Sequence, residues 1–171
     1  HSRSANAKWL TEIAHRNPIW IHTKDAERIG VVNGDLLKVT TEIGWFVDKV
    51  WVTEAIKPSI VACSHHIGRW RREQDSGNRF MSNTVDIINM GDGLWKMKTV
   101  KGIQSWETND PDTNRIWWRD GGVHQNITHA TNPDPISGAH CWLQKVSISL
   151  PNSDENYGDI FVDTKKSFEH F

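Results

Sequence analysis

The stretch Ser64–Arg69 combines hydrogen-bonding side chains with a residue that lets the backbone approach a ligand closely. His65 and His66 are followed by Gly68 and Arg69. Glycine permits close backbone approach, so this loop suits the wall of a site for a phosphate or another polar group. Adjacent histidines point in different directions at a strand end, and we do not expect a joint metal site. The alternative is a solvated basic turn.

A second polar stretch, Gly121–Asn126, begins with two glycines and ends in His124, Gln125 and Asn126. A carboxamide carries both donors and an acceptor. Gln125 and Asn126 therefore suit a heterocyclic edge on which donors and acceptors alternate. His129 and His140 are interpreted as histidines whose hydrogen bonds are satisfied within the protein.

Three further candidates lie elsewhere along the chain. Within His22–Asp25, the carboxylate of Asp25 is able to accept two N–H bonds from a guanine edge, which makes Asp25 a candidate for guanine recognition. His22 and Thr23 are candidates beside it. Alternatively, Asp25 or Thr23 only caps a short helix. The guanidinium of Arg3 suits a pyrophosphate, unless the start of the chain is simply solvated. Lys145 is able to reach a phosphate, and a surface lysine is the alternative.

Short strands and few helices must position these groups. Gly30 predicts a helix end, and the Asn33-Gly34 pair predicts a tight turn. Residues 65–122 show no clear period and are expected to be long loops with a few short elements, while 151–171 is expected to be a polar tail with a weak element at 160–162. The expected elements are a helix within 7–14, a short helix at 25–30, and strands at 19–23, 36–41, 45–53, 60–64 and 142–150.

Composition limits the classes of protein to which this chain can belong. A chain of 171 residues fits one domain, and 37% apolar with 24% charged residues indicates a folded globule. A net charge of −1 argues against a nucleic-acid binder held by bulk positive charge. The mean hydropathy of −0.59 and the short apolar runs predict neither a transmembrane helix nor a signal peptide.

Tryptophan and cysteine contents lead to two further expectations. There are ten tryptophans, and we expect Trp20, Trp45 and Trp51 to fill the core. The two cysteines, Cys63 and Cys141, form neither a disulfide framework nor a zinc set and are expected to be buried. Because the sequence opens on histidine rather than methionine, we expect a fragment of a longer polypeptide, with 1–171 forming a single domain.

Seven blocks of the sequence form a recognisable pattern in this order: Asn17–Ala26, Gly30-Val31, Asn33-Gly34-Asp35, Gly44, Val52–Pro58, Gly122–Asn126 and Asp134–Gly138. Together they resemble the C-terminal molybdopterin-dinucleotide-binding domain of the dimethyl-sulfoxide-reductase family of molybdenum and tungsten oxidoreductases. The resemblance covers about residues 1–150, and its first block is shared with other double-psi barrels.

The resemblance implies a mainly β fold, a six-stranded double-psi β-barrel with short helices and long loops. It also implies that the chain holds bis-molybdopterin guanine dinucleotide, with Mo or W, for oxygen-atom or electron transfer. Asn126 is the first choice for a pterin contact and Gln125 the next. The full set of implied cofactor-binding residues is Arg3, His22, Thr23, Asp25, His65, His66, Gly68, Arg69, Gln125, Asn126 and Lys145.

The resemblance has consequences beyond this chain. The protein ligand to the metal lies in an earlier domain in this family, so we expect no catalytic or metal-ligating residue here and no turnover by the isolated fragment. The implied partners are the remaining domains of the same catalytic subunit, together with an iron–sulfur electron-transfer subunit, with or without a membrane anchor. The implied setting is a membrane-associated bacterial complex, periplasmic or cytoplasmic.

Two other hypotheses remain open on the sequence. One is a stand-alone double-psi barrel that binds a protein partner, as adaptor domains of some unfolding ATPases do, and it would not require the blocks at 121–138. The other is a carbohydrate-binding module with a tryptophan platform, which would place several coplanar rings on one exposed face.

Overall fold

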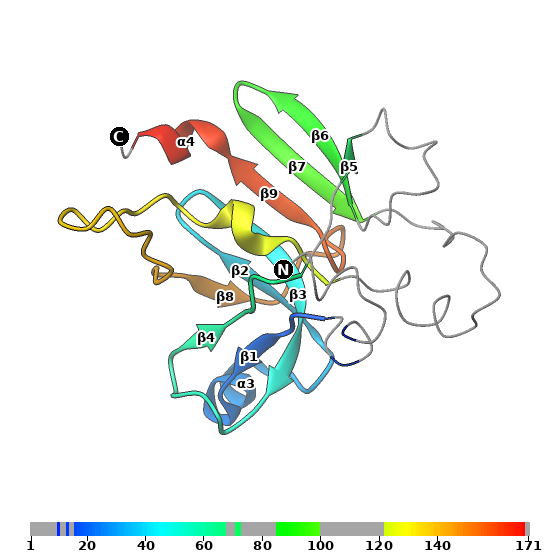
Figure 1. Cartoon of the computed structure of the whole chain (residues 1–171). Coiled ribbons are helices and arrows are strands. Elements are labelled where there is room, and N and C mark those ends of the chain that lie inside the picture. The colour runs from blue at the N-terminus through cyan, green and yellow to red at the C-terminus, as the bar shows by residue number, and fades with distance from the viewer. Residues whose placement is uncertain are drawn as a thin grey trace.

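The structure is a computed structural model that describes residues 10, 13, 16–67, 71–72, 85–99 and 122–169. It is mainly β, with few short helices, as predicted (Figure 1). The described helices are too short and too polar to cross a membrane. The described elements are β1 (Ile19–Ile21), α3 (Thr23–Ile29), β2 (Leu36–Thr40), β3 (Gly44–Val52), β4 (Val61–Ala62), β5 (Arg71–Arg72), β6 (Val85–Gly91), β7 (Leu94–Thr99), the 3₁₀ helix η3 (Gln125–Thr128), β8 (Ser147–Ser149), β9 (Ile160–Asp163) and α4 (Thr164–Phe168).

Strand β3 organises the sheet because its nine residues have several partners. Its last three residues pair in parallel with β1, and its first three pair antiparallel with β9. Strand β2 pairs antiparallel with β3 along Trp45–Lys49. Strand β4 adds to β1, and β8 adds to β2. Within the described residues the sheet is not closed, since β4 and β8 are edges.

Apart from Phe46, the side chains of the buried core are aliphatic, which corrects the expectation that tryptophans fill the core. Ile19 and Ile21 are 0% exposed, whereas Trp20 between them is half-buried and Trp51 is 43% exposed. Side chains alternate between the two faces of a strand, so the isoleucines take the inner face and leave the tryptophan outside. Trp20 and Trp51 pair edge to face at 4.4 Å on that outer face.

Local signals in the first third of the chain predicted the elements well. Gly30 ends α3 in the left-handed conformation, φ 83°, and its N–H donates to Ala26. Gly34 follows Asn33 with φ 91°, as the tight turn requires. The strand expected at 60–64 forms only at β4.

The polar middle contains a hairpin that the sequence interpretation missed. Strands β6 and β7 pair antiparallel across a turn at Asp92 and Gly93, and β7 then pairs with β9 (Figure 1). Both turn residues have positive φ, 52° and 80°. The Asp-Gly pair between apolar stretches is a hairpin signal, and it was overlooked because the whole of 65–122 was interpreted as long loops with a few short elements.

The C-terminal segment is part of the sheet rather than a tail. The expected element at 160–162 is present as β9, which lies between β3 and β7, and Ile160 is 0% exposed. Lys38 of β2 also forms an ion pair with Glu155 at 2.5 Å. The strand predicted for 142–150 is ordered as a strand only at β8, and Cys141 is exposed rather than buried.

Candidate functional site

Asn17 joins two loops that are far apart in the sequence. Its side-chain amide donates to the carbonyls of Ser64 (2.9 Å) and Val123 (2.8 Å), and its Oδ1 accepts the N–H of Val123 (2.8 Å). The side chain is buried. Asn17 therefore fixes the loop after β4 against the segment before η3, and we call the resulting group the mouth cluster: Asn17, Ser64, His65, Val123, Gln125 and Asn126.

Two neighbouring residues show how tightly this junction is packed. Gly122 has φ 74°, and a side chain there would meet Ile67 and the Oδ1 of Asn17. The thiol of Cys63 donates to the carbonyl of Asn17 at 3.0 Å. Burial, and then the nearby Asp48 carboxylate, raise the pKa of Cys63, so the thiol stays protonated.

Helix η3 places the two predicted carboxamides against the loop after β4. Gln125 donates to the carbonyl of Ser64 (3.3 Å), and Asn126 donates to the carbonyl of His65 (3.0 Å). The Oδ1 of Asn126 is buried and accepts no hydrogen bond from the residues that the structure describes. Burial lowers the pKa of the preceding His124, which favours its neutral form near pH 7. An unpaired buried acceptor costs free energy unless a ligand supplies a donor.

The two adjacent histidines have different neighbours, as expected. His65 stacks on Trp142 with ring centroids 5.4 Å apart, and the Nδ1 of His66 lies against the hydroxyl of Ser64. Among the residues that the structure describes, no group of three potential ligands could hold a metal ion.

Trp142 also contacts two histidines, His129 and His140, whose hydrogen bonds the sequence interpretation expected to be satisfied within the protein. The ring of His140 meets Trp142 edge on at 4.5 Å, and His129 does so at 5.4 Å. His129 also contacts the carbonyl of Trp142 through Nε2 (2.9 Å). The hydrogen bonds of the His129 ring agree with that interpretation, whereas His140 contributes ring contacts to His129 and Trp142.

A second polar group, the α3 cluster, surrounds the start of helix α3: His22, Thr23, Asp25, Arg28, Glu54 and Ser59. His22 is the N-cap, because its Nδ1 accepts the N–H of Lys24 (3.1 Å). The Nε2 of His22 therefore carries the proton that faces Glu54 at 3.0 Å. The hydroxyl of Thr23 donates to the same carboxylate and lowers the pKa of Glu54, and His22 adds to this effect.

Asp25 is buried, and both of its oxygens have partners inside the protein. One accepts the N–H of Ser59 (2.6 Å), and the other faces Arg28 at 3.0 Å. Ser59 has φ 63°, a conformation that is unfavourable for a residue other than glycine. Asp25 therefore holds the turn before β4, and the capping role considered for Asp25 falls to His22.

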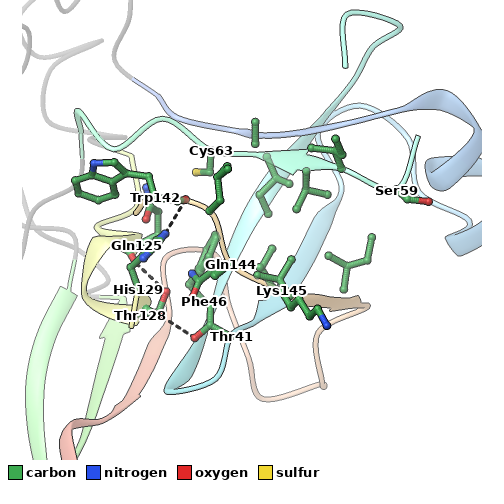
Figure 2. A pocket seen from close by; sticks show the side chains of 18 of the residues that line it. Thr41, Phe46, Ser59, Cys63, Gln125, Thr128, His129, Trp142, Gln144 and Lys145 are labelled. Atoms are coloured by element: carbon green, nitrogen blue, oxygen red, sulfur yellow. Dashed lines mark hydrogen bonds between the residues drawn. The ribbon is translucent and has the colours of Figure 1, made fainter. Parts of the chain in front are cut away.

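A cavity of about 820 Å³ opens between β4 and the segment before β8 (Figure 2). Ser59 and Cys63 lie on one side of it, and Gln144 and Lys145 lie on the other. Of the predicted site residues, Asp25, Gln125 and Lys145 line this cavity, while His22, Thr23, His65, His66 and Asn126 do not. Among the described residues, none forms a hydrogen bond with the buried Oε1 of Gln144.

The structure thus brings part of the predicted set together. His65, Gln125 and Asn126 meet in the mouth cluster, whereas His22, Thr23 and Asp25 form the α3 cluster. Arg3, Gly68 and Arg69 lie outside the described residues. The sequence interpretation missed Asn17, Glu54 and Gln144 as polar groups of these sites. Asn17 and Glu54 both lie in blocks that carry the family resemblance, Asn17–Ala26 and Val52–Pro58, but neither was named as a site residue.

Comparison with known proteins agrees with the resemblance drawn from the motifs. A family model described as "Molydopterin dinucleotide binding domain" matches residues 1–96, which is more than half of the chain. A dimethyl sulfoxide reductase catalytic subunit from Halobacterium salinarum is 33% identical over 78 residues, 46% of this chain. That segment is 9% of the relative's length. The chain belongs to the molybdopterin dinucleotide binding domain family.

Proposed function

We propose that the mouth cluster holds the pterin edge of a molybdopterin guanine dinucleotide, within the catalytic subunit of an oxidoreductase. The observation that carries this proposal is the buried Oδ1 of Asn126, which has no hydrogen-bond partner in the described chain. A pterin ring offers N–H donors along its edge, and one of them would satisfy this oxygen. Membership of the dinucleotide-binding family supports the same ligand class.

The residues around Asn126 fit such a group. Gln125 and Asn126 each use one amide hydrogen on a main-chain carbonyl, and each amide retains a second hydrogen. His65 is exposed beside them. When bound, the cofactor supplies the redox chemistry at its metal, and this chain supplies orientation and hydrogen bonds.

The wider assignment forms part of the same proposal. The cofactor is bis-molybdopterin guanine dinucleotide with Mo or W, and the parent enzyme transfers an oxygen atom or electrons. His22, Thr23, His66 and Lys145, with Arg3, Gly68 and Arg69, are the further candidate contacts. In the complete enzyme we expect a closed double-psi barrel and an iron–sulfur partner subunit. We expect no activity of the 171-residue chain alone.

The two other hypotheses gain no support from the described residues. The rings of Trp20 and Trp51 meet at 75°, so this pair is not the flat platform that a carbohydrate module uses. The blocks at 122–126 and 134–138, which an adaptor domain would not require, are both ordered: the first carries the orphaned acceptor, and Asp134 stabilises the second by accepting from Ser137.

Nuclear magnetic resonance on the ¹⁵N-labelled chain tests the proposal. Titration with a soluble pterin should shift the side-chain amide signals of Gln125 and Asn126, and Asn126→Ala should weaken binding about tenfold, the loss of one hydrogen bond of roughly 1.4 kcal/mol. Asn152→Ala, at an exposed asparagine, is the matched control and should bind normally. Unchanged amide signals at saturating pterin would contradict the proposal.

A further inference from the structure

A chain of contacts fixes the direction of the Asn126 carboxamide. Its Oδ1 is buried and has no partner among the described residues, while its Nδ2 donates to the carbonyl of His65 at 3.0 Å. The oxygen and the nitrogen belong to one rigid amide plane, so the direction of the Nδ2 bond also sets the direction of Oδ1. His65 lies in a turn after β4, outside the described helices and strands. The position of His65 therefore decides where the Oδ1 of Asn126 points.

Trp142 contacts His65 through its ring and the end of η3 through its main chain. The rings of His65 and Trp142 stack with centroids 5.4 Å apart and planes inclined by 23°. The carbonyl of Trp142 accepts a hydrogen bond from the Nε2 of His129 at 2.9 Å (Figure 2). His129 caps the end of η3, and its N–H donates to the carbonyl of Asn126 at 3.1 Å. The contacts Asn126–His65–Trp142–His129 thus close into a ring that begins and ends at Asn126.

The short loop before Trp142 holds this residue in place. The N–H of Cys141 donates to the carbonyl of Asn132 at 2.9 Å, and Pro133 and His140 form an antiparallel bridge. The ring of His140 meets that of Trp142 edge on, with centroids 4.5 Å apart. Trp142 is nevertheless 56% exposed. Burial of apolar surface therefore accounts for only part of what this tryptophan does, and its contacts lead to the groups that hold the mouth cluster.

We propose that Trp142 is a positioning residue of the cofactor site, which holds the Asn126 carboxamide through His65 and His129 so that its Oδ1 faces the pterin edge. A hydrogen bond is strong only within a narrow range of distance and angle. A carboxamide that is already oriented therefore binds with a smaller loss of conformational freedom. Trp142 itself does not touch the pterin. The inference rests on the proposed function for the identity of the ligand, whereas the hydrogen bond from Asn126 to His65 is present without it.

Hydrogen exchange of the Asn126 side-chain amide, measured by nuclear magnetic resonance on the ligand-free chain, tests the positioning. In Trp142→Ala this amide should exchange with solvent about fivefold faster, because His65 loses its stacking partner. Trp142→Phe keeps a ring for His65 and should restore most of the slow exchange. Trp51→Ala is the matched control, since Trp51 is 43% exposed and packs on Trp20 instead, and it should leave the exchange unchanged. Equal exchange in wild type and Trp142→Ala would overturn the proposal.

Pterin binding shows whether Trp142 acts through Asn126. Trp142→Ala should weaken the binding of a soluble pterin about fivefold, compared with about tenfold for Asn126→Ala. The double variant should bind like Asn126→Ala alone, because a positioning residue contributes nothing once the group that it positions has been removed. A double variant about fiftyfold weaker than wild type, the product of two independent effects, would contradict the proposal.

The two measurements distinguish this inference from the proposed function. Faster exchange at Asn126 in Trp142→Ala, with no pterin binding by wild type, would contradict the pterin assignment and support the positioning role. Equal pterin binding by wild type and Trp142→Ala would do the reverse. Unchanged main-chain signals of β2 and β3 show that a variant is folded. Trp142→Leu, which keeps an apolar side chain without a ring, should behave like Trp142→Ala and carries the same test if the alanine variant does not fold.

Discussion

The α3 cluster and the mouth cluster contain similar polar side chains, yet their hydrogen bonding differs. In the α3 cluster, both oxygens of Asp25 and both ring nitrogens of His22 have partners within the chain. In the mouth cluster, the hydrogen bonds of the Asn17 side chain are all made, but the buried Oδ1 of Asn126 has no partner within the described part of the chain. The comparison teaches that the number of hydrogen bonds a side chain already makes within the protein, rather than its polarity, separates residues that support the fold from residues available to a ligand.

The largest effect should come from Asn17, the saturated member of the mouth cluster. Asn17→Ala removes three hydrogen bonds in a buried place, takes both main-chain partners from Val123 and leaves the carbonyl of Ser64 with only its bond from Gln125. We expect the free energy of unfolding to fall by about 3 kcal/mol, measured by urea denaturation. Asn152→Ala serves as the exposed control. A change below about 1 kcal/mol would mean that Asn17 does not hold the two loops together.

Asp25 tests whether the α3 cluster is structural. Asp25→Ala leaves the N–H of Ser59 and the Arg28 guanidinium without their acceptor, and we expect a loss of about 2 kcal/mol in the free energy of unfolding. Asp25→Asn, which keeps one acceptor oxygen, should lose less. If guanine-nucleotide binding disappeared while stability did not change, Asp25 would belong with the ligand-binding residues instead.

Replacing Asn126 by alanine should change the free energy of unfolding much less than the same substitution at Asn17. Asn126→Ala gives up one hydrogen bond to His65 but also removes the unsatisfied Oδ1, so the two effects partly cancel. We expect the free energy of unfolding to change by less than about 1 kcal/mol. Thermal and urea denaturation both measure it, and a loss as large as that of Asn17→Ala would assign Asn126 to the framework.

The smallest expected effect is the pH dependence of stability that comes from Glu54 of the α3 cluster. The hydrogen bond from Thr23 and the proximity of His22 hold the pKa of Glu54 below its usual 4.5. A carboxyl whose pKa is lowered by folding stabilises the protein above pH 4.5, and this contribution is lost as the pH falls through the lowered pKa. Wild type should therefore exceed Glu54→Gln slightly in urea midpoint at pH 7, with the two converging in acid. A difference that grows on acidification would contradict this assignment.

Much of the first third of the fold could be predicted from local signals. Gly30 and the Asn33-Gly34 pair fixed two turns, and alternating apolar residues marked β2 and β3. The tryptophans were misassigned because a strand offers two faces, and the sequence does not state which face is inside. The central place of β9 was missed because its pairings with β3 and β7 join segments that are distant in the sequence. The β6–β7 hairpin is local, and its Asp-Gly turn signal was overlooked.

The candidate site was predicted as residue types but not as a set of contacts. His65, Gln125 and Asn126 were named, and the structure brings them together, but Asn17 was not recognised as their common support. Its role depends on contacts across 47 and 106 positions of the chain, and no local pattern encodes such contacts.

The sequence by itself determined the family, the mainly β class and the types of polar residue available, because motifs, turns and alternation are local properties of the chain. Tertiary structure alone decided which polar groups satisfy one another. Hydrogen-bond saturation depends on where distant segments meet, so only the folded chain shows that both oxygens of Asp25 have partners and that the Oδ1 of Asn126 has none among the described residues.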